Sequence, residues 1–212
     1  MENSKCKTKP SSGGDAKILP PSIFPLPASR HLPRVPSRAE CLALMVERAM
    51  LPNIHRHSLQ VARVSLALAS HLQASNPQLD LALLEAGALL HDIAKTECLH
   101  SAQKHTEVGA AFLLARGFPE VAEIVAQHVN LKAGHGKNGI TEIEIVHYAD
   151  KRVLHEEIVD LETRFQYLQE RYGRTLEDRR RIAALLQTTL NQEQKIFRHL
   201  PFPPTELSRI LI

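Results

Sequence analysis

From Ser37 onward, apolar residues recur at the spacing that places them on one face of an α-helix. Ser37 with Glu40 and Thr141 with Glu144 have the spacing of capping boxes, which mark helix starts. The segments that the pattern predicts as helices are 38–50, 53–75, 81–95, 102–116, 119–131, 142–171 and 176–198. No alternating pattern of useful length indicates a strand. We therefore predict an all-α fold, a bundle of about seven helices.

The first 36 residues differ from the rest of the chain. They hold seven of the thirteen prolines among Ser, Gly and Lys, and such a segment neither sustains helices nor buries enough apolar surface to fold. We expect a proline-rich, disordered arm at residues 1–36, one helical domain at 37–200 with its last helix at 176–198, and a short tail at 201–212.

The arm also accounts for the positive net charge of +3. Residues 1–38 contain seven Lys or Arg and two acidic residues, whereas the rest of the chain contains 19 basic and 21 acidic residues. The helical body is therefore slightly acidic. This balance gives no electrostatic basis for binding nucleic acid, and we expect no nucleic-acid partner.

Composition also narrows the cellular setting. The three cysteines are odd in number and widely separated, which supports neither a disulfide framework nor a thiolate zinc site. No apolar run approaches the roughly 20 residues that span a bilayer, and the N-terminus lacks the apolar stretch of a signal peptide. We expect a cytoplasmic protein with no membrane partner, and the sequence leaves its oligomeric state open.

Six polar residues lie on helix faces that are otherwise apolar, so their side chains should point inward. For example, His57 shares a face with Val61 and Val64, and Asp92 lies about 100° round its helix from His91. The six residues are His57, His91, Asp92, His105, His128 and Asp150. Burying carboxylates is costly unless they are paired or bound to metal.

A single histidine on an apolar face is more often a satisfied core residue than a metal ligand. Six such residues on five predicted helices favour a metal site instead. The donors would be imidazole nitrogen and carboxylate oxygen without sulfur, which suits Fe, Mn, Zn, Co or Ni better than Ca or Mg. We expect one or two divalent transition-metal ions.

Three sequence blocks resemble the defining motifs of the HD-domain metal-dependent phosphohydrolases. The blocks are Arg56-His57-Ser58-Leu59-Gln60-Val61-Ala62, His91-Asp92-Ile93-Ala94-Lys95 and Tyr148-Ala149-Asp150-Lys151. The resemblance covers about residues 40–165 and implies the HD-type helical bundle. It also implies that the first metal is held by His57, His91, Asp92 and Asp150.

His105 and His128 resemble the additional histidines of the two-metal members of this superfamily, which include the bacterial branch that hydrolyses diadenosine tetraphosphate. In such a site Asp92 would bridge two metals. The chain departs from that branch after Lys151, where Arg152-Val153-Leu154-His155 replaces the expected Glu-Pro and arginine. The resemblance implies hydrolysis of a phosphate ester or anhydride of a small phosphorylated metabolite or nucleotide by a metal-activated hydroxide.

Lysines near the expected ligands are candidates for contacting the substrate. Lys95 lies one helical turn beyond His91, and with Asp92 it forms the candidate catalytic pair, because an ammonium can neutralise a phosphate oxygen as charge develops. The alternative for Lys95 is a favourable cation at a helix C-terminus. The candidate substrate-binding residues are Lys95, Lys104, Lys132 and Lys151, of which the last three are alternatively solvated surface charges.

Two other interpretations stay open. A regulatory module of the HD type would keep the bundle and sense a nucleotide without hydrolysing it, although such a module would not need the complete ligand set found here. A purely structural interpretation treats the histidines as polar core residues. It predicts that chelators leave the melting temperature unchanged, since a metal bound only to the native state would add stability.

Overall fold

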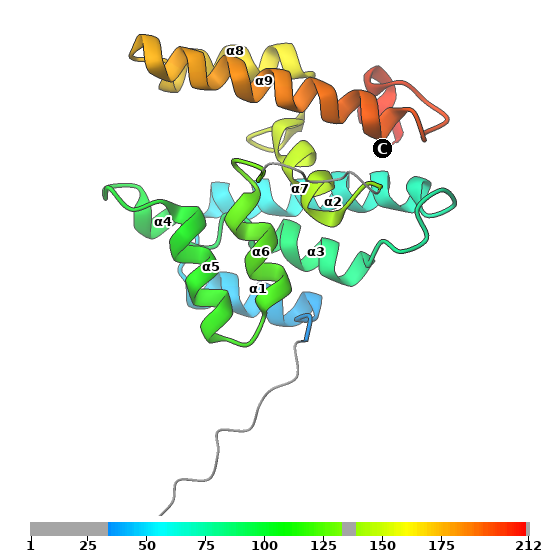
Figure 1. Cartoon of the computed structure of the whole chain (residues 1–212). Coiled ribbons are helices and arrows are strands. Elements are labelled where there is room, and N and C mark those ends of the chain that lie inside the picture. The colour runs from blue at the N-terminus through cyan, green and yellow to red at the C-terminus, as the bar shows by residue number, and fades with distance from the viewer. Residues whose placement is uncertain (1–33, 133–138, 211–212) are drawn as a thin grey trace, which may run out of the picture. The chain divides into compact units, whose positions relative to one another are not determined.

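The computed structural model describes residues 34–132 and 139–210, which form helices, one 3₁₀ turn and one short β-hairpin (Figure 1). The elements are α1 (Arg38–Glu47), α2 (Pro52–Leu72), α3 (Leu81–Leu90), α4 (Lys95–Cys98), α5 (His105–Ala115), α6 (Pro119–Gln127), α7 (Glu142–Lys151), β1 (Val153–Leu154), β2 (Glu157–Ile158), α8 (Leu161–Tyr172), α9 (Leu176–Phe197), η1 (Pro204–Glu206) and α10 (Leu207–Ile210). The predicted all-α class is confirmed. Most of the predicted arm, residues 1–33, lies outside the described residues.

Side-chain caps fix the starts of several helices. The Ser37 hydroxyl accepts a hydrogen bond from the backbone N–H of Glu40, and the Thr141 hydroxyl accepts one from the N–H of Glu144. Both predicted capping boxes are therefore present, and they begin α1 and α7 at the predicted places. Thr175 caps α9 in the same way.

The predicted long helix 142–171 is wrong. The chain leaves α7 after Lys151, forms an antiparallel hairpin in which Val153 pairs with Ile158, and begins α8 after the capping residue Asp160. Neither glycine nor proline marks this break. The hairpin turns at His155, whose φ of 55° is a left-handed conformation that residues with a side chain seldom adopt.

The predicted helix 81–95 also ends early. Residue Leu90 closes α3, a turn follows at residues 91–94, and Lys95 is the first residue of the short helix α4. The backbone N–H of Ile93 bonds the carbonyl of Leu90, and that of Lys95 bonds the carbonyl of Asp92. Lys95 is therefore the first residue of α4 and does not lie in the last turn of a long helix 81–95, although in the four-residue α4 it is also the basic residue of the last turn. With these breaks, the described residues contain more helices than the seven predicted.

The core lies where α2, α3, α6 and α7 pack together. In α7 the side chains of Ile145, Val146 and Tyr148 are fully buried. Helices α8 and α9 pack as a pair beside α7, as Figure 1 shows. Arg152, which follows α7, bonds the segment after β2 and the start of η1. Its Nε donates to the carbonyl of Val159 at 2.7 Å, and its guanidinium also donates to the carbonyl of Pro204 at 3.0 Å. The end of α7 is thus held rigidly.

In residues 34–132 and 139–210, we find no helix with both the length and the apolar character that crossing a membrane requires.

Close packing between α3 and α6 predicts a destabilising Gly87→Ala variant. A Cβ added at Gly87 would lie 2.6 Å from Ile124 Cδ1, and Ile124 is buried and cannot move away freely. Alanine in a helix is otherwise favoured over glycine by about 1 kcal/mol, but overpacking of this kind costs about 1–3 kcal/mol. Chemical denaturation should therefore show a lower free energy of unfolding.

The matched control is the same substitution in an Ile124→Ala background, where the added methyl group has space. There Gly87→Ala should be neutral or stabilising. Equal stabilisation by Gly87→Ala in both backgrounds would show that the two helices do not meet at this position.

Candidate metal centre

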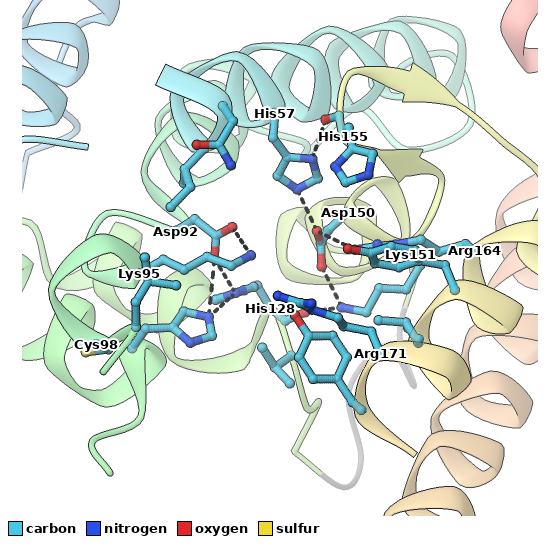
Figure 2. Close-up of a pocket in the computed structure, with 18 of the residues that line it drawn as sticks. His57, Asp92, Lys95, Cys98, His128, Asp150, Lys151, His155, Arg164 and Arg171 are labelled. Atoms are coloured by element: carbon cyan, nitrogen blue, oxygen red, sulfur yellow. Dashed lines mark hydrogen bonds and ion pairs between the residues drawn. The ribbon is translucent and has the colours of Figure 1, made fainter. Parts of the chain in front are cut away.

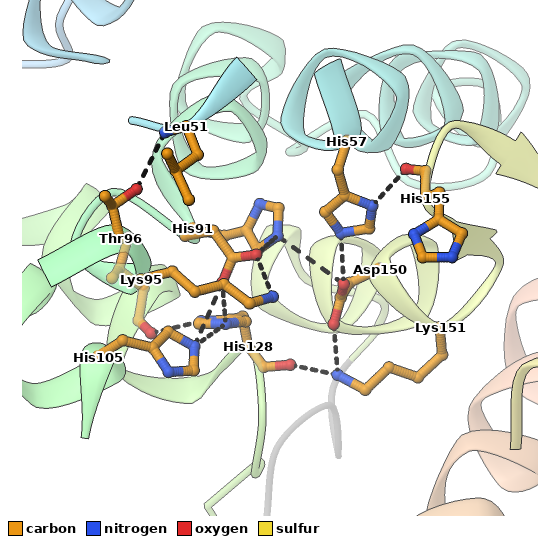
Figure 3. Close-up of polar contacts among 12 residues, drawn as sticks. Leu51, His57, His91, Lys95, Thr96, His105, His128, Asp150, Lys151 and His155 are labelled. Carbon is orange, nitrogen blue, oxygen red and sulfur yellow. Dashed lines mark hydrogen bonds and ion pairs between the residues drawn. The ribbon is translucent and has the colours of Figure 1, made fainter. Parts of the chain in front are cut away.

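All six predicted ligands lie together, as Figure 3 shows for the labelled histidines and Asp150. They come from five places in the sequence: the first turns of α2, the turn after α3, the start of α5, the end of α6 and the last turn of α7. In this order they are His57, His91 with Asp92, His105, His128 and Asp150. The helical bundle thus brings together residues that are up to 93 positions apart.

Three of the histidines are oriented by backbone carbonyls. In each, Nδ1 lies within hydrogen-bond distance of a carbonyl oxygen, which can only accept, so Nδ1 carries the proton and Nε2 faces the centre. The bonds join His57 to the carbonyl of His155 at 2.9 Å, His91 to that of Ala88 at 2.7 Å and His128 to that of Val125 at 2.8 Å. In the neutral rings, the Nε2 lone pairs are therefore available as ligands.

On one side of the centre, two imidazoles face the two carboxylates. His57 Nε2 lies 3.0 Å from Asp150 Oδ1, and His91 Nε2 lies 3.3 Å from Asp92 Oδ2 and 3.8 Å from Asp150 Oδ1. His57, His91 and Asp92 each offer a donor atom within 4.8 Å of the others. Lone pairs that face one another across such distances need a proton or a metal ion between them.

On the other side, Asp92 faces two more imidazoles. Its Oδ1 lies 3.2 Å from His105 Nε2 and 3.5 Å from His128 Nε2, and these two nitrogens are 3.1 Å apart. Asp92, His105 and His128 form a second group of donor atoms within 4.8 Å of one another. Asp92 therefore belongs to both groups.

The buried atoms of this cluster fit a bound cation. His91 Nε2 and Asp92 Oδ1 are fully buried and have no hydrogen-bond partner among the described residues. Unsatisfied buried polar atoms are costly, and a cation would satisfy both. A mixed nitrogen and oxygen donor set suits a transition-metal ion.

Asp92 is ionised in this environment. Only 1% of the residue is exposed, and burial alone would raise its pKa. The nearby ammonium of Lys95 and the imidazoles of His91, His105 and His128 outweigh burial and hold the pKa well below its usual range. The carboxylate is thus available as a ligand at neutral pH.

Lys95 is charged at neutral pH, whereas His128 is neutral. Burial would lower the pKa of Lys95, but the carboxylates of Asp92 and Asp150 raise it, and Lys95 Nζ lies 2.7 Å from Asp92 Oδ2. Burial lowers the pKa of His128 to about 4. At neutral pH, Lys95 is therefore a cation at the centre, while His128 is a neutral ring with a free lone pair.

The four candidate substrate-binding lysines occupy different positions. Lys95 and Lys151 line the pocket over the cluster. Lys151 is buried and donates to Asp150 Oδ2 at 2.9 Å and to the carbonyl of His128 at 2.6 Å, and burial lowers its pKa. Lys104 and Lys132 are exposed, form ion pairs with glutamates at 2.8 Å and 3.8 Å, and are absent from the lining of this pocket.

The pocket encloses about 610 Å³ and opens onto both carboxylates (Figure 2). Its lining includes residues that the sequence analysis did not single out, namely His155, Arg164, Tyr167, Arg171 and Tyr172. The last four share one face of α8, and their spacing in the sequence is that of one helix face. The sequence does not place these residues at the pocket, because a single helix through residues 142–171 would carry them away from the ligand cluster, whereas the hairpin turns α8 back toward it.

Metal binding should raise the unfolding temperature. Adding Mn²⁺ to protein freed of metal by a chelator stabilises the native state, because the unfolded chain lacks the site, and an ion at 100 times its Kd adds about 2.7 kcal/mol. Asp92→Asn should abolish the increase, since Asp92 belongs to both donor groups. Thermal unfolding monitored by circular dichroism measures the effect.

His71→Gln is the matched control, because His71 is exposed and lies outside both donor groups; its Nδ1 bonds the carbonyl of Ala67, and its ring contacts Phe202. It should respond to Mn²⁺ as the wild type does. An unfolding temperature of the wild type that is unchanged by Mn²⁺, Fe²⁺, Co²⁺, Ni²⁺ and Zn²⁺ would show that the cluster is a metal-free polar network.

The geometry agrees with comparisons to known proteins. Residues 54–157 match the family model of the HD domain. A tRNA (cytidine(56)-2'-O)-methyltransferase of Thermoplasma volcanium is 28% identical over 109 residues, which cover 51% of this chain but only 30% of the methyltransferase. No solved structure matches. The match to the family model confirms the resemblance seen in the three sequence blocks, and residues 54–157 of this chain are an HD domain.

Proposed function

We propose that this chain is a metal-dependent phosphohydrolase that cleaves a phosphate ester or anhydride of a small phosphorylated molecule. The observation that carries the proposal is the position of Asp92, whose carboxylate belongs to two groups of metal-ligating atoms. The HD domain supports the same chemistry, because metal-dependent phosphohydrolases make up the superfamily that the three blocks resemble.

The residues divide into two ligand sets that share one carboxylate. In our proposal the first divalent transition-metal ion is held by His57, His91, Asp92 and Asp150, and the second by Asp92, His105 and His128. When bound, two such ions supply Lewis-acid activation of water and neutralise the charge that develops on phosphoryl oxygens.

Lys95 is the group best placed to touch the substrate. Its side chain is 36% exposed and lines the pocket, while its Nζ stays 2.7 Å from Asp92 Oδ2. Because its pKa is raised, it remains protonated at neutral pH and can donate to a phosphate oxygen. Such a donor stabilises negative charge as the bond to phosphorus breaks.

Lys151 has a positioning role in this proposal. Its ammonium joins Asp150 to the backbone of His128, so it links one residue from each ligand set. This link holds the Asp150 carboxylate and the His128 residue in fixed positions, so their donor atoms keep their separation before a ligand binds.

We do not extend the methyl transfer named for the Thermoplasma relative to this chain. Most of that methyltransferase lies outside the matched 109 residues. The described residues offer metal ligands around a pocket.

Hydrolysis should depend on Asp92 and Lys95 to different degrees. Protein purified anaerobically and supplied with Mn²⁺ or Fe²⁺ should release phosphate or a nucleoside phosphate in a screen of phosphoesters and nucleotides. Asp92→Asn should lower kcat by about a thousandfold or more, because both ligand sets lose a donor. Lys95→Gln, which loses one charged donor, should lower kcat by about a hundredfold.

The control is Arg180→Gln, which changes an exposed charge on α9 away from the pocket lining and should keep the wild-type kcat. A metal-loaded protein that binds a nucleotide and leaves it intact after long incubation would overturn hydrolysis in favour of a sensing module. A protein that neither binds metal nor hydrolyses any substrate would overturn the proposal entirely.

A further inference from the structure

One wall of the pocket comes from α8 and the first half of α9, which follow the residues matched by the HD family model. This wall lies across the pocket from Asp92 and Lys95. Figure 2 shows Arg164 and Arg171 reaching from α8 toward the middle of the pocket, with Arg164 beside Asp150 and Lys151. The wall therefore faces whatever molecule binds over the ligand cluster.

Arg164 is a mostly buried cation with an unused donor. Its side chain is only 12% exposed, and its Nε has no hydrogen-bond partner among the described residues. Its nearest carboxylate oxygen is Asp150 Oδ1 at 3.9 Å, and His57 already approaches that oxygen to 3.0 Å. Since a buried guanidinium without full hydrogen bonding is costly, an anion in the pocket would stabilise it.

Arg171 extends the same cationic face. It follows Arg164 by seven residues, or about 10 Å along the helix axis. The described residues give it no hydrogen bond or ion pair, and its side chain lines the mouth of the pocket. Two guanidiniums at this separation, one deep and one shallow, suit a ligand with more than one anionic group.

Between and beside the arginines the wall is apolar. Leu168 shares their face of α8, and Ile182 and Leu185 of α9 complete an aliphatic surface in the pocket. Tyr167 and Tyr172 also line the pocket. Flat aromatic groups such as nucleobases pack well against aliphatic and aromatic side chains.

We propose that α8 and the facing part of α9 select the substrate, and that the substrate class is a nucleoside carrying two or more phosphates. Arg164 contacts the phosphate next to the one that is attacked, Arg171 contacts phosphate nearer the pocket mouth, and the aliphatic surface packs against the base. The proposal rests on the proposed function only for the position of the attacked phosphate at the metal centre.

Equilibrium binding of three probes tests this recognition. Isothermal titration calorimetry in the presence of Mn²⁺ compares α,β-methylene-ADP, in which a methylene group replaces the bridging oxygen of the anhydride and prevents its hydrolysis, with AMP and with methylenediphosphonate. Wild-type protein should bind α,β-methylene-ADP at least about tenfold more tightly than either other probe, since only this probe offers both a base and two phosphorus groups.

Variants then separate the two parts of the wall. Arg171→Gln should weaken binding of α,β-methylene-ADP by about tenfold, as loss of a charged hydrogen bond does. Arg164→Gln should weaken it at least as much, and Arg164→Lys should restore part of the affinity. Leu185→Ala should weaken the nucleotide probes but not methylenediphosphonate. Arg180→Gln, outside the pocket lining, should bind all probes as the wild type does.

Two outcomes would overturn the inference. One is equal affinity of the wild type for α,β-methylene-ADP and methylenediphosphonate, and the other is wild-type affinity for α,β-methylene-ADP in both single variants, Arg171→Gln and Arg164→Gln. Hydrolysis of p-nitrophenyl phosphate, measured in parallel, separates this inference from the proposed function. Hydrolysis without a preference for nucleotides would refute only the proposed selection of the substrate by α8 and α9. Nucleotide binding with the expected pattern but without hydrolysis of any substrate would refute the proposed function and support nucleotide recognition by α8 and α9.

Discussion

A carboxylate that is almost fully buried needs a cation or other polar partners within a few ångströms, and at Asp92 the fold places such groups from several elements. Lys95 of α4 contacts one oxygen, while His105 of α5 and His128 at the end of α6 face the other. His91 stands beside Asp92 in the turn after α3. Helices that are distant in sequence must therefore end or begin at this point, and the arrangement of the bundle follows from that requirement.

The ends of α3 and α6 show how the chain meets this requirement. Carbonyls in the last turn of a helix lack intrahelical partners. At these two ends the free carbonyls of Ala88 and Val125 accept hydrogen bonds from the rings of His91 and His128. The same bond caps the helix and directs Nε2 toward the centre. A longer α3 would close its own carbonyls and leave the His91 ring without this anchor.

The sequence predicts the class of fold, the capped starts of α1 and α7, and all six clustered residues, because each rests on local spacing and on the inward face of a helix. It does not predict the turn at residues 91–94 or the hairpin after α7. Both breaks lack glycine and proline, and both are held by tertiary contacts such as the bond from His57 to the carbonyl of His155. The sequence does not identify Arg164 and Arg171 as pocket residues for this reason, since their approach to the centre depends on the hairpin.

In the proposed metal centre Asp92 is shared by two cation sites, and anomalous diffraction from crystals soaked in Mn²⁺ would locate both cations. We expect two anomalous peaks that both contact the Asp92 carboxylate, one also contacting His57, His91 and Asp150, and the other His105 and His128. A single peak, or peaks that do not contact Asp92, would contradict the shared carboxylate.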